Sequence, residues 1–308
     1  MYKFSVRMNY KMTIENHLTP RFGDMLVSAA DAEHGRFLVN MRSVQAFIAE
    51  MKERGYAAYS IHHFHEVLRV VLKYAQQWYR SLESNPAEGV VLPKLRPKSK
   101  PWALTVPEAA GLLTALAARP KQQAALWLLV VNGLRRGEFL ALRWGSVDED
   151  RRELSITEAY YRGHLDTPKT EASVRTVPLD PFAIALLNRW KRQSRRTAPS
   201  DLIFGTRNGK PESPNNLLRR HVFPACDQLG IPRATYLTFR RTFSTWSSYN
   251  AVPAKDIAEM MGHADVNMQL TYIQTMDAAK RTAVEKIATE LARIGQISDE
   301  GEKSVVVN

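Results

Sequence analysis

The chain has 308 residues, a formal net charge of +12 and 44% hydrophobic residues, which predicts two folded domains with enough apolar material for their cores. No apolar run is long enough to span a bilayer, no secretory signal opens the chain, and the single cysteine excludes an intramolecular disulfide. A cytoplasmic protein is therefore predicted, and the positive charge favours a nucleic acid as its partner without deciding the matter.

Residues 1–90 show helical periodicity and are predicted to form a small bundle. A short first segment carries apolar residues four apart and ends at Gly23. A second helix has one apolar face, made by Val44, Phe47, Ile48 and Met51. Gly55 is placed to end this helix, and a third helix is predicted to start near Ser60.

Residues 91–102 are predicted to form a basic linker, because the segment 93–101 holds three prolines, four basic residues and no acid. Its cations are Lys94, Arg96, Lys98 and Lys100. The segment can serve as a solvated spacer, as a basic strap along DNA phosphates, or as both.

Residues 103–296 are predicted to form a second domain that is mainly helical with a small antiparallel sheet, followed by a disordered tail at 297–308. Helices are predicted after Thr105, at about 122–131, after Gly133, from Asp180-Pro181, from Ser213-Pro214, and over about 238–249, 254–261 and 277–294. Strands are predicted from Glu153 to Ile156, near Tyr160 to His164, and from Val174 to Leu179.

Four motifs of the second domain supply, in order, the groups that DNA cleavage through a covalent intermediate requires. They put Arg135 in the first turn of a helix, Lys169 in a hairpin turn, Arg240 in the opening of another helix, and Tyr272 nine residues after His263. A guanidinium fork matches two phosphate oxygens, a desolvated lysine can protonate a leaving oxygen, and a tyrosine can attack phosphorus. No metal or cofactor is needed where enough cationic donors converge.

These motifs resemble those of the tyrosine recombinase family, which includes phage integrases and the chromosome-dimer resolving recombinases. The similarity covers nearly the whole chain, since residues 13–90 also resemble the family's helical core-binding domain. It implies five catalytic residues, one supporting carboxylate and five DNA-binding residues. The catalytic residues are Arg135, Lys169, Arg240, His263 and the nucleophile Tyr272. The supporting carboxylate is Glu138. The DNA-binding residues are Lys94, Arg96, Lys98, Lys100 and Arg241.

The resemblance also implies the partners and the reaction. The two domains would close around double-stranded DNA, and a 3′-phosphotyrosyl link would carry strands between partners. The protein would act as a homo-tetramer on paired DNA sites, or exist as a monomer away from DNA, with accessory DNA-bending or directionality proteins. It would need no cofactor, metal or membrane and would be associated with the nucleoid.

Two departures from the family pattern leave alternatives open. Leu237 stands where the family has a histidine three residues before the arginine, and leucine cannot donate to phosphate. About a dozen residues precede the first predicted helix, where many integrases carry a separate arm-binding domain, so either the protein uses simple core sites only or its start is truncated. One alternative is a catalytically weak or inactive DNA-binding protein on this scaffold, which would bind DNA without forming a covalent adduct. The other is a type IB topoisomerase, which would relax supercoils without producing recombinants.

His62 and His65 lie three residues apart on a predicted helix and could share a metal ion. No cysteine or carboxylate completes an obvious set of ligands around them, so no metal site is expected.

Overall fold

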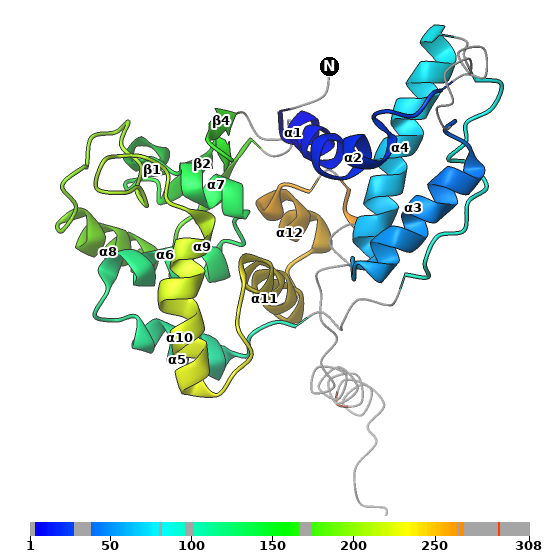
Figure 1. Ribbon diagram of the computed structural model, residues 1–308. Coiled ribbons are helices and arrows are strands. Elements are labelled where there is room, and N and C mark those ends of the chain that lie inside the picture. Colours follow the sequence, from blue (N-terminus) through cyan, green and yellow to red (C-terminus); the bar gives the residue numbers. More distant parts are fainter. Residues whose placement is uncertain are drawn as a thin grey trace, which may run out of the picture. The chain divides into compact units, whose positions relative to one another are not determined.

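The computed structural model describes residues 4–27, 38–79, 82–95, 102–166, 174–263, 265–267 and 289. The chain divides into two compact units, residues 1–99 and residues 100–308, and each is treated by itself (Figure 1). Both units are mainly helical, and the named strands of the described residues all belong to the second unit. The predicted fold class is thereby confirmed, while the domain boundaries drawn at 90, 102 and 296 stay a prediction.

The first unit begins with a helix at Phe4, earlier than the start that the sequence predicts. Its elements are α1 (Phe4–Thr13), the π-helical turn η1 (Ile14–Leu18), α2 (Thr19–Phe22), α3 (Met41–Glu53) and α4 (Ala58–Tyr79). The predicted apolar face of α3 is buried, and the side chain of Asn40 caps this helix by accepting from the backbone N–H of Ser43. Gly55, with φ at +79°, follows α3 in the left-handed region, as predicted for a residue that ends a helix.

The first residues of the predicted linker pack against α3 and α4. Gln45 exchanges two hydrogen bonds with the backbone of Val91, and Nε2 of His62 bonds to the carbonyl of Pro93. Nε2 of His65 bonds to the carbonyl of Ala87 in the same way. Both imidazoles therefore tie α4 to the segment that follows it, and no cluster of three or more metal-ligating side chains occurs in the described part of the chain.

Helices also make up most of the second unit. They are α5 (Val106–Ala115), α6 (Pro120–Val131), α7 (Arg136–Ala141), α8 (Pro181–Lys191), α9 (Pro214–Leu217), α10 (Phe223–Leu229), α11 (Tyr236–Tyr249) and α12 (Ala254–Met261). The helices α5, α8 and α9 begin where predicted, after Thr105, Asp180 and Ser213. The side chains of Thr105 and Asp180 cap their helices, whereas that of Ser213 makes no cap to α9. The buried helix α6 packs against α5, α8 and α11 and forms the centre of the core.

The sheet differs from the one predicted. Its three antiparallel strands are β1 (Val147–Asp148), β2 (Glu153–Ile156) and β5 (Arg175–Pro178), in the order β1-β2-β5. The segment predicted as a single strand near Tyr160 to His164 is instead a separate hairpin of β3 (Ala159–Tyr161) and β4 (His164–Asp166). Gly163, with φ at +91°, supplies the tight turn that reverses the chain within that segment.

Among the described residues, no helix is long and apolar enough to cross a membrane. Two predicted segments lie outside the described residues: the helix at 277–294, except for residue 289, and the tail at 297–308.

Candidate active site

A glycine turn holds the first arginine motif at the start of α7. Gly133 has φ at +60°, and a Cβ atom on it would overlap the ring of Phe243, so only glycine fits. Two residues later, the backbone N–H of Arg135 donates to Oε2 of Glu138 at 2.9 Å and closes the beginning of α7. The side chain of Arg135 remains 35% exposed, so a ligand can reach it.

Glu138 is a buried carboxylate shared by two arginines. Its side chain is 2% exposed, and Nη1 of Arg135 donates to its Oε1 at 2.7 Å. Both terminal nitrogens of Arg175 donate to the same carboxylate, at 3.1 and 3.0 Å. Burial would raise the pKa of Glu138, but the hydrogen bonds and charges of Arg175 and Arg135 outweigh it and hold the pKa below its ordinary value. The carboxylate is therefore ionised at neutral pH and orients both guanidinium groups.

Arg240 lies near the start of α11 and is buried, with 4% exposure. Its Nη1 donates to the carbonyl of Gly133 at 2.5 Å. Its Nη2 lies 2.6 Å from the carbonyl of Met261 and 2.8 Å from Nε2 of His263. These contacts join the glycine turn before α7, the beginning of α11 and the end of α12 around a single cation.

The hydrogen bond from Arg240 determines which ring nitrogen of His263 carries the proton. A guanidinium can only donate, so Nε2 of His263 accepts and the neutral ring carries its proton on Nδ1. Burial and the charges of Arg240, Arg135 and Arg175 lower the pKa of His263 to about 4, which is consistent with this neutral form. Any hydrogen bond that His263 donates at neutral pH therefore comes from Nδ1.

The C-terminal end of α12 is the element on which the arginines converge. Three successive carbonyls accept hydrogen bonds of 2.6 Å, that of Met260 from Nε of Arg175, that of Met261 from Nη2 of Arg240, and that of Gly262 from Nη2 of Arg135. Gly262, with φ at +64°, ends the helix in the left-handed conformation. The last carbonyls of a helix lack partners within it and carry partial negative charge, so they stabilise the cations.

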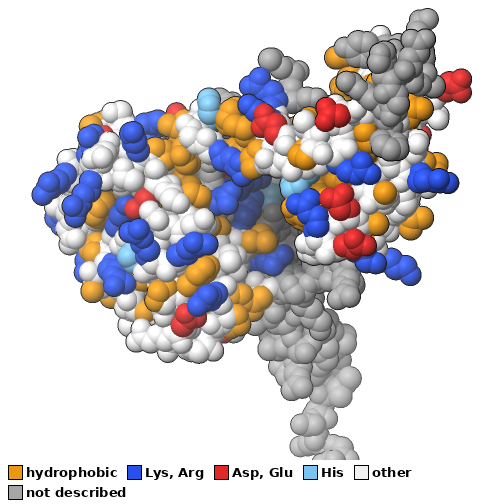
Figure 2. Space-filling model, viewed as in Figure 1, with side chains coloured by type: hydrophobic (Ala, Val, Ile, Leu, Met, Phe, Trp, Pro, Cys, Tyr) orange, Lys and Arg blue, Asp and Glu red, His pale blue; other side chains and the backbone are white. Residues whose placement is uncertain are grey.

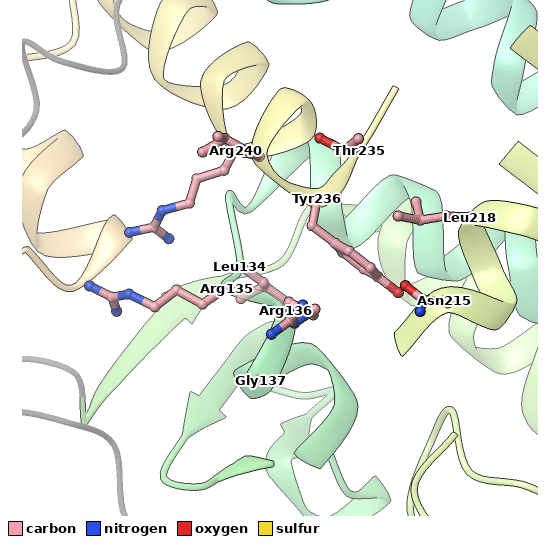
Figure 3. Close-up of a pocket in the computed structure, with 10 residues that line it drawn as sticks. Leu134, Arg135, Arg136, Gly137, Asn215, Leu218, Thr235, Tyr236 and Arg240 are labelled. Carbon is pink, nitrogen blue, oxygen red and sulfur yellow. The ribbon is translucent and has the colours of Figure 1, made fainter. Parts of the chain in front are cut away.

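Arg135 and Arg240 also line an open pocket of about 500 Å³. Figure 3 shows that Arg135 and Arg240 come from different elements and extend side by side, with their guanidinium groups on the side away from Tyr236 and Asn215. Leu237, 46% exposed, lines the same pocket one helical turn before Arg240. The site therefore presents adjacent cations next to a cavity that solvent can enter.

The structure brings together four of the predicted site residues: Arg135, Glu138, Arg240 and His263. It does not place Lys169, Tyr272, Arg96, Lys98 or Lys100, which lie outside the described residues. The strands on either side of the segment that carries Lys169 belong to different sheets, so they do not form the predicted hairpin. Lys94 is exposed in the first unit, and Arg241 is half-buried with an enclosed Nε.

Sequence reasoning missed Arg175, although a signal for it was available. Strand alternation puts Arg175 on the same face of β5 as Val177, which is fully buried. A charged residue on the inner face of a strand needs a partner, and Glu138 is that partner.

The surface of the second unit is rich in cations. On the face shown in Figure 2, Lys and Arg side chains predominate over Asp and Glu across this unit. A surface of this kind attracts polyanions over distances of about a Debye length, roughly 10 Å at moderate salt.

Comparison with solved structures identifies the class of fold. The Tn1549 transposon integrase, solved in complex with transposon right end DNA, is 20% identical and superposes with a TM-score of 0.72 over 93% of this chain and 95% of that one. A lambda integrase tetramer bound to a Holliday junction is 16% identical, with a TM-score of 0.66 over 90% and 75% of the two chains. The described fold is therefore that of the tyrosine recombinases and integrases.

Sequence comparison gives the family. The phage integrase family matches residues 103–279. A tyrosine recombinase XerC-like protein of Caldanaerobacter subterraneus subsp. tengcongensis is 26% identical over 189 residues, which are 53% of this chain and 48% of that protein. The alignment thus spans about half the length of this relative. The chain belongs to the phage integrase family of tyrosine recombinases.

Proposed function

We propose that this protein is a site-specific DNA recombinase that cleaves and rejoins strands through a 3′-phosphotyrosyl intermediate. The observation that carries the proposal is the convergence of Arg135, Arg240 and His263, from three separate segments, on the end of α12. Such a cluster of preorganised donors suits the charge that develops on phosphate oxygens during transfer.

In the proposed reaction, the hydroxyl oxygen of Tyr272 attacks the scissile phosphorus. A bond forms between this oxygen and phosphorus, and the bond from phosphorus to the 5′ oxygen breaks. The tyrosine loses its proton to solvent, and Lys169 protonates the leaving 5′ oxygen. The phosphate remains on Tyr272 until the 5′ hydroxyl of a partner strand attacks it and reverses the step.

The described residues would stabilise the transition state. Arg135 and Arg240 would bind the non-bridging oxygens, and His263 would donate from Nδ1, because its Nε2 already accepts from Arg240. Glu138 and the backbone carbonyls hold the arginines before DNA arrives, so little reorganisation is needed when the charge develops.

The proposed partner is double-stranded DNA, supported by the net charge of +12 and by relatives of the same fold solved on DNA. The linker cations at 94, 96, 98 and 100 and Arg241 would contact phosphates. The tetrameric lambda integrase supports a homo-tetramer on paired sites, and accessory proteins would set direction.

Covalent trapping tests the proposal. Nicked genomic DNA of the source organism is incubated with protein, adducts that survive denaturation are recovered and sequenced, and the recovered site is remade as a synthetic nicked duplex. We expect an adduct from the wild type and none from Tyr272→Phe, which lacks the attacking oxygen but should still bind the duplex. Specific binding without an adduct from the wild type would indicate a DNA-binding protein without cleavage activity. Relaxation of plasmid supercoils without recombinants would indicate a topoisomerase. An adduct that persists in Tyr272→Phe would contradict the assigned nucleophile.

Leu237 gives a second prediction, since it leaves the pocket without the donor that the family usually has there. Leu237→His should raise the rate of adduct formation roughly tenfold, about the value of one hydrogen bond to a charged group. The rate is measured in a single turnover on the synthetic nicked duplex. Leu229→His, at an exposed leucine of α10 outside the pocket, is the matched control. An unchanged or slower rate for Leu237→His would count against the pocket as the phosphate site.

A further inference from the structure

Arg175 is a buried link between the two parts of the candidate site, the start of α7 and the end of α12. Its side chain is 5% exposed. It donates to both oxygens of Glu138 through its two terminal nitrogens and to the carbonyl of Met260 through Nε, at 2.6 Å. One guanidinium thus connects the carboxylate of α7 with the last turn of α12.

These bonds do more than neutralise a buried charge. Glu138 also holds Arg135, and the carbonyl next to that of Met260 holds Arg240. Arg175 therefore contacts the carboxylate that supports Arg135 and the helix end whose next carbonyl supports Arg240.

We propose that Arg175 is a positioning residue, which never touches DNA but holds the end of α12 at the distance from Glu138 that strand cleavage requires. This inference rests on the proposed recombinase function. The element it positions leads directly to His263 and, nine residues later, to Tyr272. A displacement at Met260 would therefore be carried into His263, three residues later.

Lysine cannot replace Arg175 in this role. The planar guanidinium holds its donors in a fixed geometry. Its two terminal nitrogens donate to the two oxygens of Glu138, and its Nε donates to the carbonyl of Met260. A lysine ammonium is a single point on a flexible stem, so it can keep the charge but not the three directions. Arg175→Lys thus keeps the positive charge but loses the hydrogen-bond geometry, so it tests the effect of geometry separately from that of charge.

The test compares Arg175→Lys and Arg175→Met with the wild type on the synthetic nicked duplex, measuring DNA affinity and the single-turnover rate of adduct formation separately. We expect affinity to stay unchanged and the rate to fall roughly 100-fold in both variants, as for a misplacement of about 1 Å. Arg143→Met is the matched control, because Arg143 also bonds a carboxylate, that of Glu158, and a carbonyl, that of Ser200, but lies outside the cluster.

The pH profile distinguishes positioning from a general loss of structure. Glu138 faces Arg135 from the start of α7, Arg175 from β5 and the ring of His263 after α12. Without Arg175, only Arg135 opposes the effect of burial and the pKa of Glu138 rises, so Arg175→Met should lose cleavage at a higher pH than the wild type as the solution is acidified. Adding Glu138→Gln removes the titrating group and should abolish this step.

The double variant has a second use. It replaces the buried Arg175–Glu138 pair by neutral side chains, so it keeps the test decisive if the unpaired carboxylate prevents Arg175→Met from folding. Wild-type cleavage rates in Arg175→Lys and in the double variant would overturn the positioning role and leave the recombinase function standing. Equal losses of affinity and rate, with an unshifted pH profile, would also overturn it. A wild type that forms no adduct would overturn the proposed function and this inference together.

Discussion

Replacing Arg240 with lysine is expected to slow formation of the covalent adduct by roughly 100- to 1,000-fold, the cost of losing one preorganised donor to a developing oxyanion. Arg240 is buried and bonds at once to the carbonyls of Gly133 and Met261 and to His263. A lysine keeps the positive charge but cannot hold these partners and a phosphate oxygen in one plane. The measurement is the single-turnover rate on the nicked duplex, with DNA affinity determined in parallel.

The control for this substitution is Arg233→Lys, because Arg233 is an exposed arginine of the same unit that pairs with Asp227. It should cleave at the wild-type rate. Circular dichroism of Arg240→Lys must match that of the wild type, so that lost folding is not mistaken for lost catalysis. A rate within a few fold of the wild type for folded Arg240→Lys would remove Arg240 from the proposed chemistry.

Glu138→Gln is expected to lower the free energy of unfolding of the second unit by about 3–5 kcal/mol at pH 7, because it leaves the buried charge of Arg175 without its counter-ion. Glutamine has nearly the same size as glutamate, so the loss reports charge rather than packing. Urea unfolding followed by tryptophan fluorescence measures it, since all the tryptophans except Trp78 belong to this unit.

The difference in unfolding free energy between the wild type and Glu138→Gln should become smaller as the pH falls. The pKa of Glu138 is lower in the folded protein than its ordinary value of 4.5, so its contribution is fully present above pH 4.5 and is lost as the pH falls through the folded-state pKa. His263, whose pKa is lowered to about 4, also destabilises the fold as the pH falls below 6.5. The charge of Glu138 raises the pKa of His263, so the difference between wild type and Glu138→Gln reports the ionisation of Glu138 together with its coupling to His263. A difference that grows on acidification would contradict the ion pair.

The sequence alone was sufficient for most helices and for the residues that begin and end them. Helical periodicity, the helix starts after Thr105 and Asp180, and the glycine after α3 are local features, and the structure confirms each of them. The sequence motifs also supplied Arg135, Glu138, Arg240 and His263, which the structure brings together. Their catalytic roles, like those of Lys169 and Tyr272, stay predictions.

Only the tertiary structure decided how the elements pair. Alternation predicts a strand but not its neighbour, so the segment near Tyr160 became a hairpin of its own while the two-residue β1 joined β2 and β5. Likewise, the periodicity of β5 puts Arg175 on the inner face but says nothing of Glu138, which lies 37 residues away in the chain.

The convergence of three arginines on α12 is the clearest case of this limit. The carbonyls that bind them are backbone groups, and every residue in the sequence has one. They become ligands only because a helix ends there, leaving them without intrahelical partners, and because folding brings β5, α11 and the start of α7 to that end. The sequence by itself determined which cations the site contains, and the packing of α12 decided what holds them.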